Sequence, residues 1–430
     1  MRETVTQFRS FNRPIRLLMI NQLTINLGFY MLMPYLANHL SGNLGLAAWL
    51  VGLTLGVRNL SQQGMFLVGG SLADRLGYKP MILIGLALRT VGFALLGMAS
   101  SLPVILVASA FTGLAGAFFN PAVRAYLAQE AGDRKVEAFA VFNVFYQLGI
   151  LAGPLIGLLL GGIAFRVTCL VAAGLFAVLA IAQARALPAR RGSRAGATES
   201  VLRDWRTALA NRAFVLFSLA MIGSYVLNFQ VYLGLPIEVR RVTGGELGVT
   251  LLFVVSGALA VAGQVRVTAW AKARWTPGQA LARGLALMGL SFIPMALAAS
   301  FVPATAVGAE LNAPLAYAVA LGPILLSAAL LTLATMVTYP FEMATIAALG
   351  GDKMIGTYYG LYNTLSGIGI AIGNLLTGAA LDAGRETGLP SLPWWTLAAV
   401  GAACALAIHA LARSGSLTAA PERPREAVPA

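Results

Sequence analysis

Apolar residues occur along this chain in long runs, which are separated by short polar and basic segments. A helix needs about 20 predominantly apolar residues to cross the hydrocarbon core of a bilayer. Runs of this length predict transmembrane helices and are too long for the core helices of a soluble fold. The predicted spans are 15–37, 47–72, 80–100, 103–128, 137–161, 164–187, 212–236, 248–271, 279–300, 314–348, 354–381 and 394–413.

Composition agrees with this pattern. The 430-residue chain is 58% hydrophobic and 11% charged, whereas soluble domains usually carry about 25% charged residues. A soluble fold of this size could not bury so much apolar surface. We therefore expect an all-α integral membrane protein with twelve transmembrane helices. A cleaved signal peptide is not expected, because the first apolar run is too long for one.

Basic residues are distributed unequally between the loops, and the formal net charge is +14. Such a charge can indicate a nucleic-acid partner, but here it lies in the gaps between apolar runs, as the positive-inside rule describes. We therefore expect membrane lipid rather than nucleic acid as the partner, and both termini in the cytoplasm. The Pro- and charge-rich tail, 414–430, is predicted to be disordered. The loops expected on the opposite side hold only Arg166, Arg240, Arg241 and Arg385.

A polar, arginine-rich segment, 188–211, divides the predicted spans into two sets of six. We interpret it as a cytoplasmic linker between an N-terminal six-helix bundle, 1–187, and a C-terminal six-helix bundle, 212–413. Trp205 and Leu209 are expected to enter the membrane interface beside the arginines of this linker.

The two sets of spans show an internal duplication with an offset near 220 residues. Two related bundles around a shared central site are typical of secondary transporters. A chance coincidence of a few Gly, Pro and Asn residues is the alternative. The duplicated pattern is Asn143, Gly149 and Gly153 in the first set, and Asn363, Gly369 and Gly373 in the second.

The turn between spans two and three carries a dense group of small and charged residues. Its sequence is Gly70-Ser71-Leu72-Ala73-Asp74-Arg75-Leu76-Gly77-Tyr78-Lys79. Gly70 permits a close approach of helices, and Gly77 permits a tight turn. Asp74 lies at a helix end, where it can meet a neighbouring helix N-terminus and a cation. This predicts a latch with Asp74 and Arg75 as gating residues, and a generic basic loop is the alternative. The matching turn of the second half has Ala271 in place of Asp74, so the latch should be asymmetric.

This turn resembles the G-x-L-A-D-R-x-G-x-K motif of the major facilitator superfamily. In span five, Gly149, Gly153, Pro154 and Gly157 resemble the G-x3-G-P-x2-G motif of its exporter branch. Nearly the whole chain resembles the MdtH-type multidrug resistance proteins of the drug:proton antiporter family, as in Gly52-Leu53-x-Leu55-Gly56-Val57-Arg58 and Arg89-x2-Gly92-Phe93-Ala94. The resemblance implies twelve helices in two pseudo-symmetric bundles and export coupled to protons. One departure is that Ser109 and Thr112 precede Gly113 where exporters carry an arginine before Q-G-x-G.

Few ionisable groups lie inside the predicted spans, and each costs at least ~2.5 kcal/mol on insertion scales. Glu342 is the only carboxylate placed well inside a helix. Desolvation favours a protonated acid, whereas a neighbouring arginine favours the carboxylate. We therefore expect Glu342 to take up the coupling proton in one state and to pair with Arg124 in the other. The alternative is that Glu342 faces a water-filled vestibule or lipid headgroups and plays no part in coupling.

Arg58 lies near the middle of span two, and its own half has no carboxylate at similar depth. It is expected either to bind an anionic group of the substrate or to hydrogen-bond carbonyl and amide oxygens. By resemblance, spans one, four, seven and ten line the central cavity, and aromatic and amide groups there suit amphipathic ligands. Packing or contact with lipid is the alternative for each. The other candidate substrate-binding residues are Asn26, Tyr30, Phe119, Asn120, Asn228, Gln230, Tyr339 and Phe341.

Other function classes lack their characteristic residues in the sequence. It has no phosphate-binding G-x4-G-K-[ST] loop and no paired carboxylates or histidine cluster for an enzyme or a metal. We expect no cofactor other than a proton gradient. The predicted function is proton-coupled export of small amphipathic molecules or drugs by a monomer in a bacterial inner membrane. Alternatives are a dedicated exporter of an endogenous metabolite, such as a siderophore or a lipid-like compound, and a proton-coupled importer.

Overall fold

A computed structural model describes residues 2–32, 36, 39–40, 44, 48–161, 165–189, 200–243, 247–299, 314–351, 354–415 and 417. Regular structure in these residues is helical, as the apolar runs predict. The first half contains α1 (Arg2–Ser10), α2 (Arg13–Tyr30), α4 (Ala48–Gln63), α5 (Phe66–Leu76), α6 (Tyr78–Met98), α7 (Leu102–Ala131), η2 (Gly132–Arg134), α8 (Lys135–Gly161) and α9 (Phe165–Ala186).

The second half begins after the predicted linker, which itself contains a short helix. Its elements are α10 (Val201–Ala210), α11 (Arg212–Asn228), η3 (Phe229–Val231), α12 (Gly234–Thr243), α13 (Leu247–Arg274), α14 (Pro277–Leu290), α15 (Ile293–Ala298), α16 (Pro314–Gly350), α17 (Ile355–Glu386) and α18 (Leu392–Arg413). Residues 190–199 of the linker and most of the predicted tail, 416 and 418–430, lie outside the described residues.

Within the described residues, nine helical segments are long and apolar enough to cross a membrane. One of them, Leu102–Gly157, covers both α7 and α8. Every predicted span has a helical counterpart, and some counterparts are broken: span two is α4 followed by α5, and span nine is α14 followed by α15. The short helices α1 and α10 were not predicted, because they are amphipathic segments outside the apolar runs.

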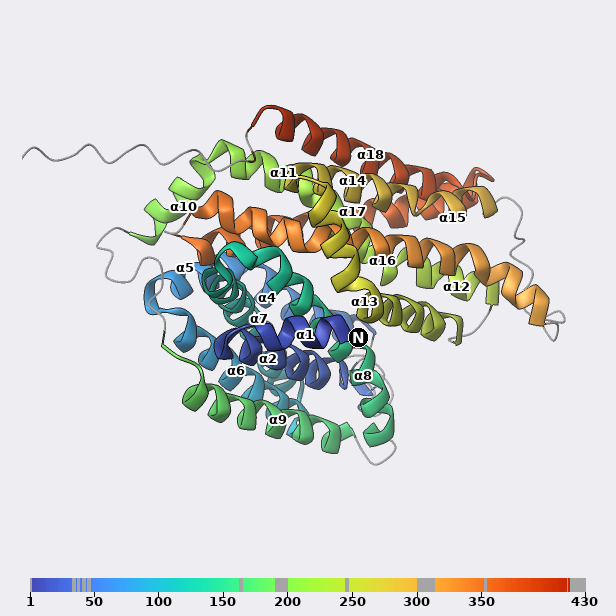
Figure 1. The fold of residues 1–430 in the computed structure, drawn as a ribbon. Helices are drawn as coiled ribbons and strands as arrows, with labels where there is room; N and C mark the ends of the chain where they lie inside the picture. Colours follow the sequence, from blue (N-terminus) through green and yellow to red (C-terminus); the bar gives the residue numbers. More distant parts are fainter. Residues whose placement is uncertain are drawn as a thin grey trace, which may run out of the picture.

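Figure 1 shows the helices in two groups, with α2 to α9 below and α11 to α18 above. In the first group α6 packs against α7 and α9, and α2 packs against α8. In the second group α14 packs against α18, and α11 packs against α17 and α18. The two groups meet where α5 contacts α17 and where α8 contacts α13 and α16. This interface positions the candidate site.

The glycines of the predicted exporter motif serve close packing of α8 on α2. A Cβ atom on Gly149 would lie 2.6 Å from Cβ of Asn26, and one on Gly153 would lie 2.8 Å from Cβ of Tyr30. Gly157 is buried as well. Small residues at this spacing let two helix backbones approach each other in a membrane.

The second group repeats this packing with different side chains. A Cβ atom on Gly369 of α17 would lie 2.4 Å from Cγ2 of Ile222, and one on Gly373 would lie 2.6 Å from Cγ1 of Val226. Both partners lie on α11, which takes the place of α2. The duplicated Gly pattern of the sequence therefore corresponds to a duplicated helix contact.

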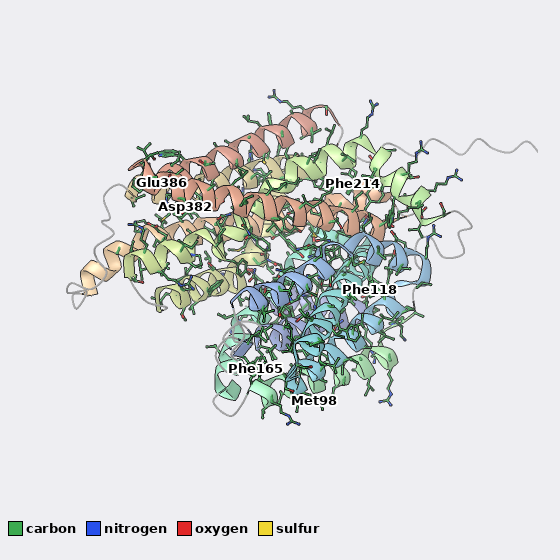
Figure 2. The ribbon with its side chains drawn as sticks, turned by 180° about the vertical axis from the view of Figure 1, so that it is seen from behind. Met98, Phe118, Phe165, Phe214, Asp382 and Glu386 are labelled. Atoms are coloured by element: carbon green, nitrogen blue, oxygen red, sulfur yellow. The ribbon has the colours of Figure 1, made fainter. Side chains whose placement is uncertain are left out.

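The two ends of the helix bundle differ in charge. We call the end that carries Arg75, Lys79, Lys272 and α10 the basic end. Figure 2 shows Phe214, in the first turn of α11, near this end, and Asp382 and Glu386 at the opposite end of the C-terminal group.

Candidate functional site

The predicted latch residue Asp74 lies at the N-terminus of α17. One carboxylate oxygen, Oδ1, accepts the backbone N–H of Gly356 at 2.8 Å, and Oδ2 accepts that of Thr357 at 2.6 Å. The hydroxyl of Thr357 donates to Oδ2 at 2.7 Å. The first N–H groups of a helix have no partner within it and favour negative charge. Asp74, which is 1% exposed, therefore joins the N-terminal group to the C-terminal group at the basic end.

Two helix backbones touch beside this carboxylate. A Cβ atom on Gly70 of α5 would lie 2.1 Å from the carbonyl oxygen of Gly356, and one on Gly360 would lie 2.4 Å from the carbonyl oxygen of Phe66. Distances this short leave no room for a side chain on either helix. Gly77, with φ of 98°, then ends α5 in a conformation that other residues rarely adopt.

The linker helix α10 covers the latch from the outside. Arg75 forms an ion pair of 2.5 Å with Asp204, whose side chain is 2% exposed. Nε1 of Trp205 donates to Oγ of Ser71 at 2.7 Å. Trp205 is half-buried and its indole N–H is satisfied within the latch, and its expected place at the membrane interface stays a prediction. Leu209, one turn further along α10, is 53% exposed.

Additional ion pairs cross the basic end. Glu137 of α8 pairs with Lys272 of α13 at 2.7 Å, and also with Arg134 at 2.7 Å. Glu3 of α1 pairs with Arg266 of α13 at 2.8 Å. A cavity of about 330 Å³ lies between α1, α8 and α13. Helix α1 was not predicted, since its apolar residues are few.

Glu342 is 2% exposed and lies on α16. Its carboxylate accepts the hydroxyl of Tyr362 and, at 3.3 Å, the hydroxyl of Ser224. Arg124 of α7 donates instead to Oδ1 of Asn363 at 2.7 Å. The direct pair that the sequence predicts between Arg124 and Glu342 is therefore not formed in this conformation, although the two charges are close enough to interact.

Both asparagines of the duplicated pattern bridge the two groups of helices. Asn143 of α8 donates to Gln264 of α13 at 2.8 Å, and Asn363 of α17 accepts from Arg124 of α7. Gln264 in turn donates to the carbonyl oxygen of Met336 at 2.9 Å. Buried polar groups need such partners, so these bonds fix how the groups meet in this conformation.

Two arginines meet on one aromatic ring inside the N-terminal group. The guanidinium carbon of Arg58 lies 4.6 Å from the ring centre of Phe29, and that of Arg89 lies 5.6 Å from the same centre. Arg58 also donates to Asn59 at 2.9 Å and to Gln62 at 3.2 Å. Arg89 was not among the predicted binding residues. Its neighbours in the sequence do not indicate that it packs against the ring of Phe29.

Some of the predicted lining residues lie along the interface between the groups. Tyr30 is close to Tyr146 and to Tyr232 of the second group. Tyr339 is close to Arg124. Asn228 accepts from Thr335 at 3.3 Å, and Asn120 is half-buried.

Other predicted lining residues are occupied in helix packing. Asn26 donates to the carbonyl oxygen of Tyr146 at 3.0 Å, and Gln230 donates to that of Val226 at 2.9 Å. Phe119 is fully buried and faces Gly85 of α6. Phe341 is 2% exposed. Their side chains are enclosed by protein in this conformation.

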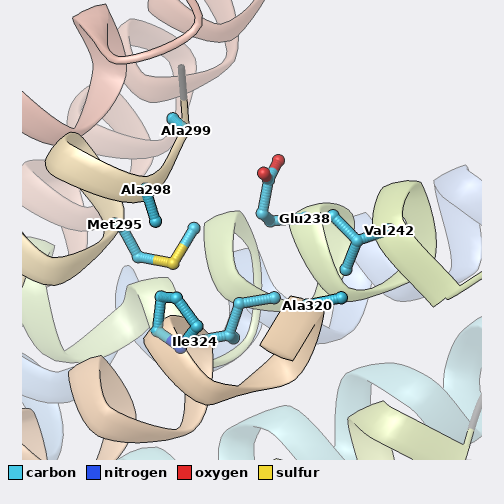
Figure 3. A pocket seen from close by; sticks show the side chains of 8 residues that line it. Glu238, Val242, Met295, Ala298, Ala299, Ala320 and Ile324 are labelled. Carbon is cyan, nitrogen blue, oxygen red and sulfur yellow. The ribbon is translucent and has the colours of Figure 1, made fainter. Parts of the chain in front are cut away.

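A small pocket lies between α12, α15 and α16 at the end opposite the basic end. Figure 3 shows its mainly apolar lining, which includes Met295, Val242 and Ile324, with Glu238 at one side. Its volume is about 10 Å³, and Glu238 is already paired with Arg241 at 2.5 Å. A space of this size holds about one water molecule, so it is not a substrate site.

The sequence matches the Major Facilitator Superfamily over residues 18–374. The chain belongs to this superfamily. Its major facilitator fold is all-helical, as predicted, and is shared with two solved transporters. The human organic anion transporter MFSD10 (TETRAN) superposes with a TM-score of 0.71 at 16% identity, covering 92% of this chain and 99% of that one. The Escherichia coli fucose:proton symporter FucP superposes with a TM-score of 0.69 at 14% identity, covering 93% and 98%.

Two relatives in sequence are bacterial transporters. The uncharacterized MFS-type transporter Rv0849 of Mycobacterium tuberculosis is 50% identical over 396 residues, which are 92% of each chain. The multidrug resistance protein MdtH of Yersinia enterocolitica is 30% identical over 400 residues, which are 92% of this chain and 93% of that one. The protein is therefore a multi-pass secondary transporter of the major facilitator type and not an enzyme.

Proposed function

We propose that this major facilitator exports small amphipathic molecules in exchange for protons, by alternating access across a bacterial inner membrane. Glu342 carries this proposal. It is the one carboxylate that the sequence places well inside a span, and it is buried beside the interface between the two groups. The likeness to a multidrug resistance protein supports export of amphipathic molecules.

The partners of Glu342 explain how protonation can depend on conformation. Tyr362 and Ser224 belong to the C-terminal group, as Glu342 does, so these bonds persist when the groups move as units. Arg124 belongs to the N-terminal group and is held by Asn363 across the interface. Movement of one group past the other changes the distance between the arginine and the carboxylate. A charge that moves relative to an acid changes how readily the acid binds a proton.

The conformation described here is joined at the basic end by the latch and the ion pairs. By the positive-inside rule we assign this end to the cytoplasm, with both termini on that side. The state is then closed toward the cytoplasm. Export requires a second state in which Asp74 leaves α17 and Arg124 leaves Asn363.

The test uses Glu342→Gln in proteoliposomes, with Glu386→Gln as a matched control. Glu386 is an exposed acid at the opposite end of the C-terminal group. We expect Glu342→Gln to abolish accumulation of a drug substrate against its gradient when a pH gradient is imposed, while exchange down the substrate gradient continues. The control should retain both activities. Unchanged pH-driven accumulation in Glu342→Gln would exclude Glu342 as the coupling residue.

A further inference from the structure

Two guanidinium groups, one buried and one half-buried, lie close together inside the N-terminal group of helices. Arg58 comes from α4 and Arg89 from α6, and both lie against the ring of Phe29 from α2. Arg89 also lies 5.8 Å from the ring centre of Phe176 and is 6% exposed. Like charges held together in a site of low dielectric repel each other strongly, so this arrangement needs a stabilising partner.

The protein itself stabilises the two arginines only in part. The face of Phe29 attracts both cations and that of Phe176 attracts Arg89. Arg58 also donates to the amide oxygens of Asn59 and Gln62. Among the described residues, Nε of Arg58 and both Nε and Nη1 of Arg89 are buried without a hydrogen-bond acceptor. Burying such donors without an acceptor is unfavourable, and more so when the group is charged.

No carboxylate of this half can neutralise the two arginines. The carboxylates of residues 1–187 are Glu3, Asp74, Glu130, Asp133 and Glu137. Glu3, Asp74 and Glu137 form the contacts at the basic end that are described above. Glu130 accepts a hydrogen bond from Asn12, which precedes α2. Asp133 lies in the turn between α7 and α8. The positive charge in the middle of the N-terminal group therefore exceeds the negative charge that the chain provides there.

We propose that Arg58 and Arg89 form a binding site for the anionic group of the transported molecule, so that the substrates are amphipathic organic anions. This inference rests on the proposed function and names its substrate class. A carboxylate, sulfonate or phosphate accepts charge-assisted bonds from the free Nε and Nη1 donors. The aromatic rings beside the arginines contact the apolar part of the same molecule.

The position of Tyr30 connects this site to the interface between the two groups. Tyr30 follows Phe29 on α2 and is close enough to Arg58 and Arg89 to interact with them electrostatically. It is also close to Tyr232 of the C-terminal group. A ligand held by the arginine pair therefore lies next to the surface along which the two groups move, as alternating access requires.

The test compares three probes that share one ring system and differ in charge. They are anthracene-9-carboxylate, anthracene-9-methanol and anthracene-9-methylamine, each titrated against the full-length protein in nanodiscs with empty nanodiscs subtracted. We expect the wild type to bind the carboxylate at least tenfold more tightly than the alcohol, and the amine least tightly. Equal affinity for the three probes, a preference for the amine, or no binding of the carboxylate overturns the proposal without any variant.

Substitutions then locate the site. Arg58→Gln and Arg89→Gln should each weaken carboxylate binding at least tenfold and leave binding of the alcohol within about twofold. Arg58→Lys and Arg89→Lys should keep part of the preference, because the charge remains. Arg283→Gln is the control, since Arg283 is exposed and lies over Trp275 far from the pair. If the Gln variants lose both ligands equally while remaining monodisperse, the arginines are structural and the proposal fails.

The test of the anion site can fail or succeed independently of the test of proton coupling. Charge-selective binding that depends on both arginines, together with transport that ignores a pH gradient, would leave the anion site standing and remove proton coupling. Transport that requires Glu342 but shows no preference for anions would do the opposite.

Discussion

Thr357 donates both its backbone N–H and its hydroxyl to Oδ2 of Asp74, although the two residues are 283 positions apart in the sequence. The bond joins α5 of one helix group to the first turn of α17 in the other. Hydrogen bonds to a charged group contribute about 1.5–3 kcal/mol. This contact therefore stabilises the state closed at the basic end more than any exposed ion pair does.

Replacing Asp74 by Asn should shift the protein away from the state closed at the basic end. The shift should correspond to about 1.5–3 kcal/mol, because the charge is lost while the shape is kept. Maleimide labelling of Ala140→Cys measures it, since Ala140 is 1% exposed on α8 beside the second group. Labelling should be at least tenfold faster in Asp74→Asn.

Glu137→Gln is the matched control for that experiment. Glu137 also bridges the groups, but its side chain is 26% exposed and Lys272 is 43% exposed. Exposed pairs contribute about 0–1 kcal/mol, so the increase in labelling should stay under fivefold. Equal effects of the two substitutions would show that Asp74 has no special role.

Gly70→Ala should impair closure of the basic end. The new Cβ would lie 2.1 Å from the carbonyl oxygen of Gly356, and a backbone atom cannot move aside as a flexible side chain can. We expect transport to fall at least tenfold while the protein remains folded in detergent. Gly56→Ala is the comparison, because a Cβ there meets no atom within 4 Å, and near-normal transport is expected for it.

The linker helix should stabilise the latch through Arg75–Asp204 and Ser71–Trp205. Asp204→Asn and Trp205→Phe each remove one of these contacts, and each should raise the Ala140→Cys labelling rate severalfold. Arg206→Gln, on the exposed face of the same helix, should not. If Arg206→Gln acts like the other two, the effect comes from the charge of the linker and not from its docking.

The duplicated glycines should differ in their tolerance of a methyl group. A Cβ on Gly149 would meet the carbonyl oxygen of Leu23 at 2.6 Å, whereas the nearest atom to one on Gly369 is the side-chain Cγ2 of Ile222 at 2.4 Å. A side chain can rotate, so Gly149→Ala should lower the thermal midpoint more, by a cost of about 1–3 kcal/mol. The ranking is read from thermal unfolding of both variants, and a larger drop for Gly369→Ala would contradict it.

The sequence predicts the spans because a bilayer imposes a length on every apolar helix. It also predicts that Asp74 meets a helix N-terminus, since charge and position at a helix end carry that information. It does not reveal that the helix is α17, because nothing local encodes a contact across 282 residues. The docking of α10 was missed for the same reason.

The site inside the membrane was predicted less well. Glu342 and Arg124 stand out in apolar runs as charges, but Tyr362, Ser224 and Asn363, which hold them, look like ordinary residues of a membrane helix. Phe119 was predicted to line the cavity because it belongs to span four. The sequence does not show which side of that helix faces the cavity. Its packing on Gly85 became visible only in the structure.

The excess positive charge around Arg58 and Arg89 has an electrical consequence for a transporter that works across an energised membrane. Each elementary charge carried through 100 mV changes the free energy by about 2.3 kcal/mol. Exchange of one outgoing monoanion for one incoming proton moves two charges in the same sense, whereas exchange of a monocation for a proton moves none. Voltage alone, without any pH difference, would then drive this protein, and the current it generates would report its stoichiometry directly.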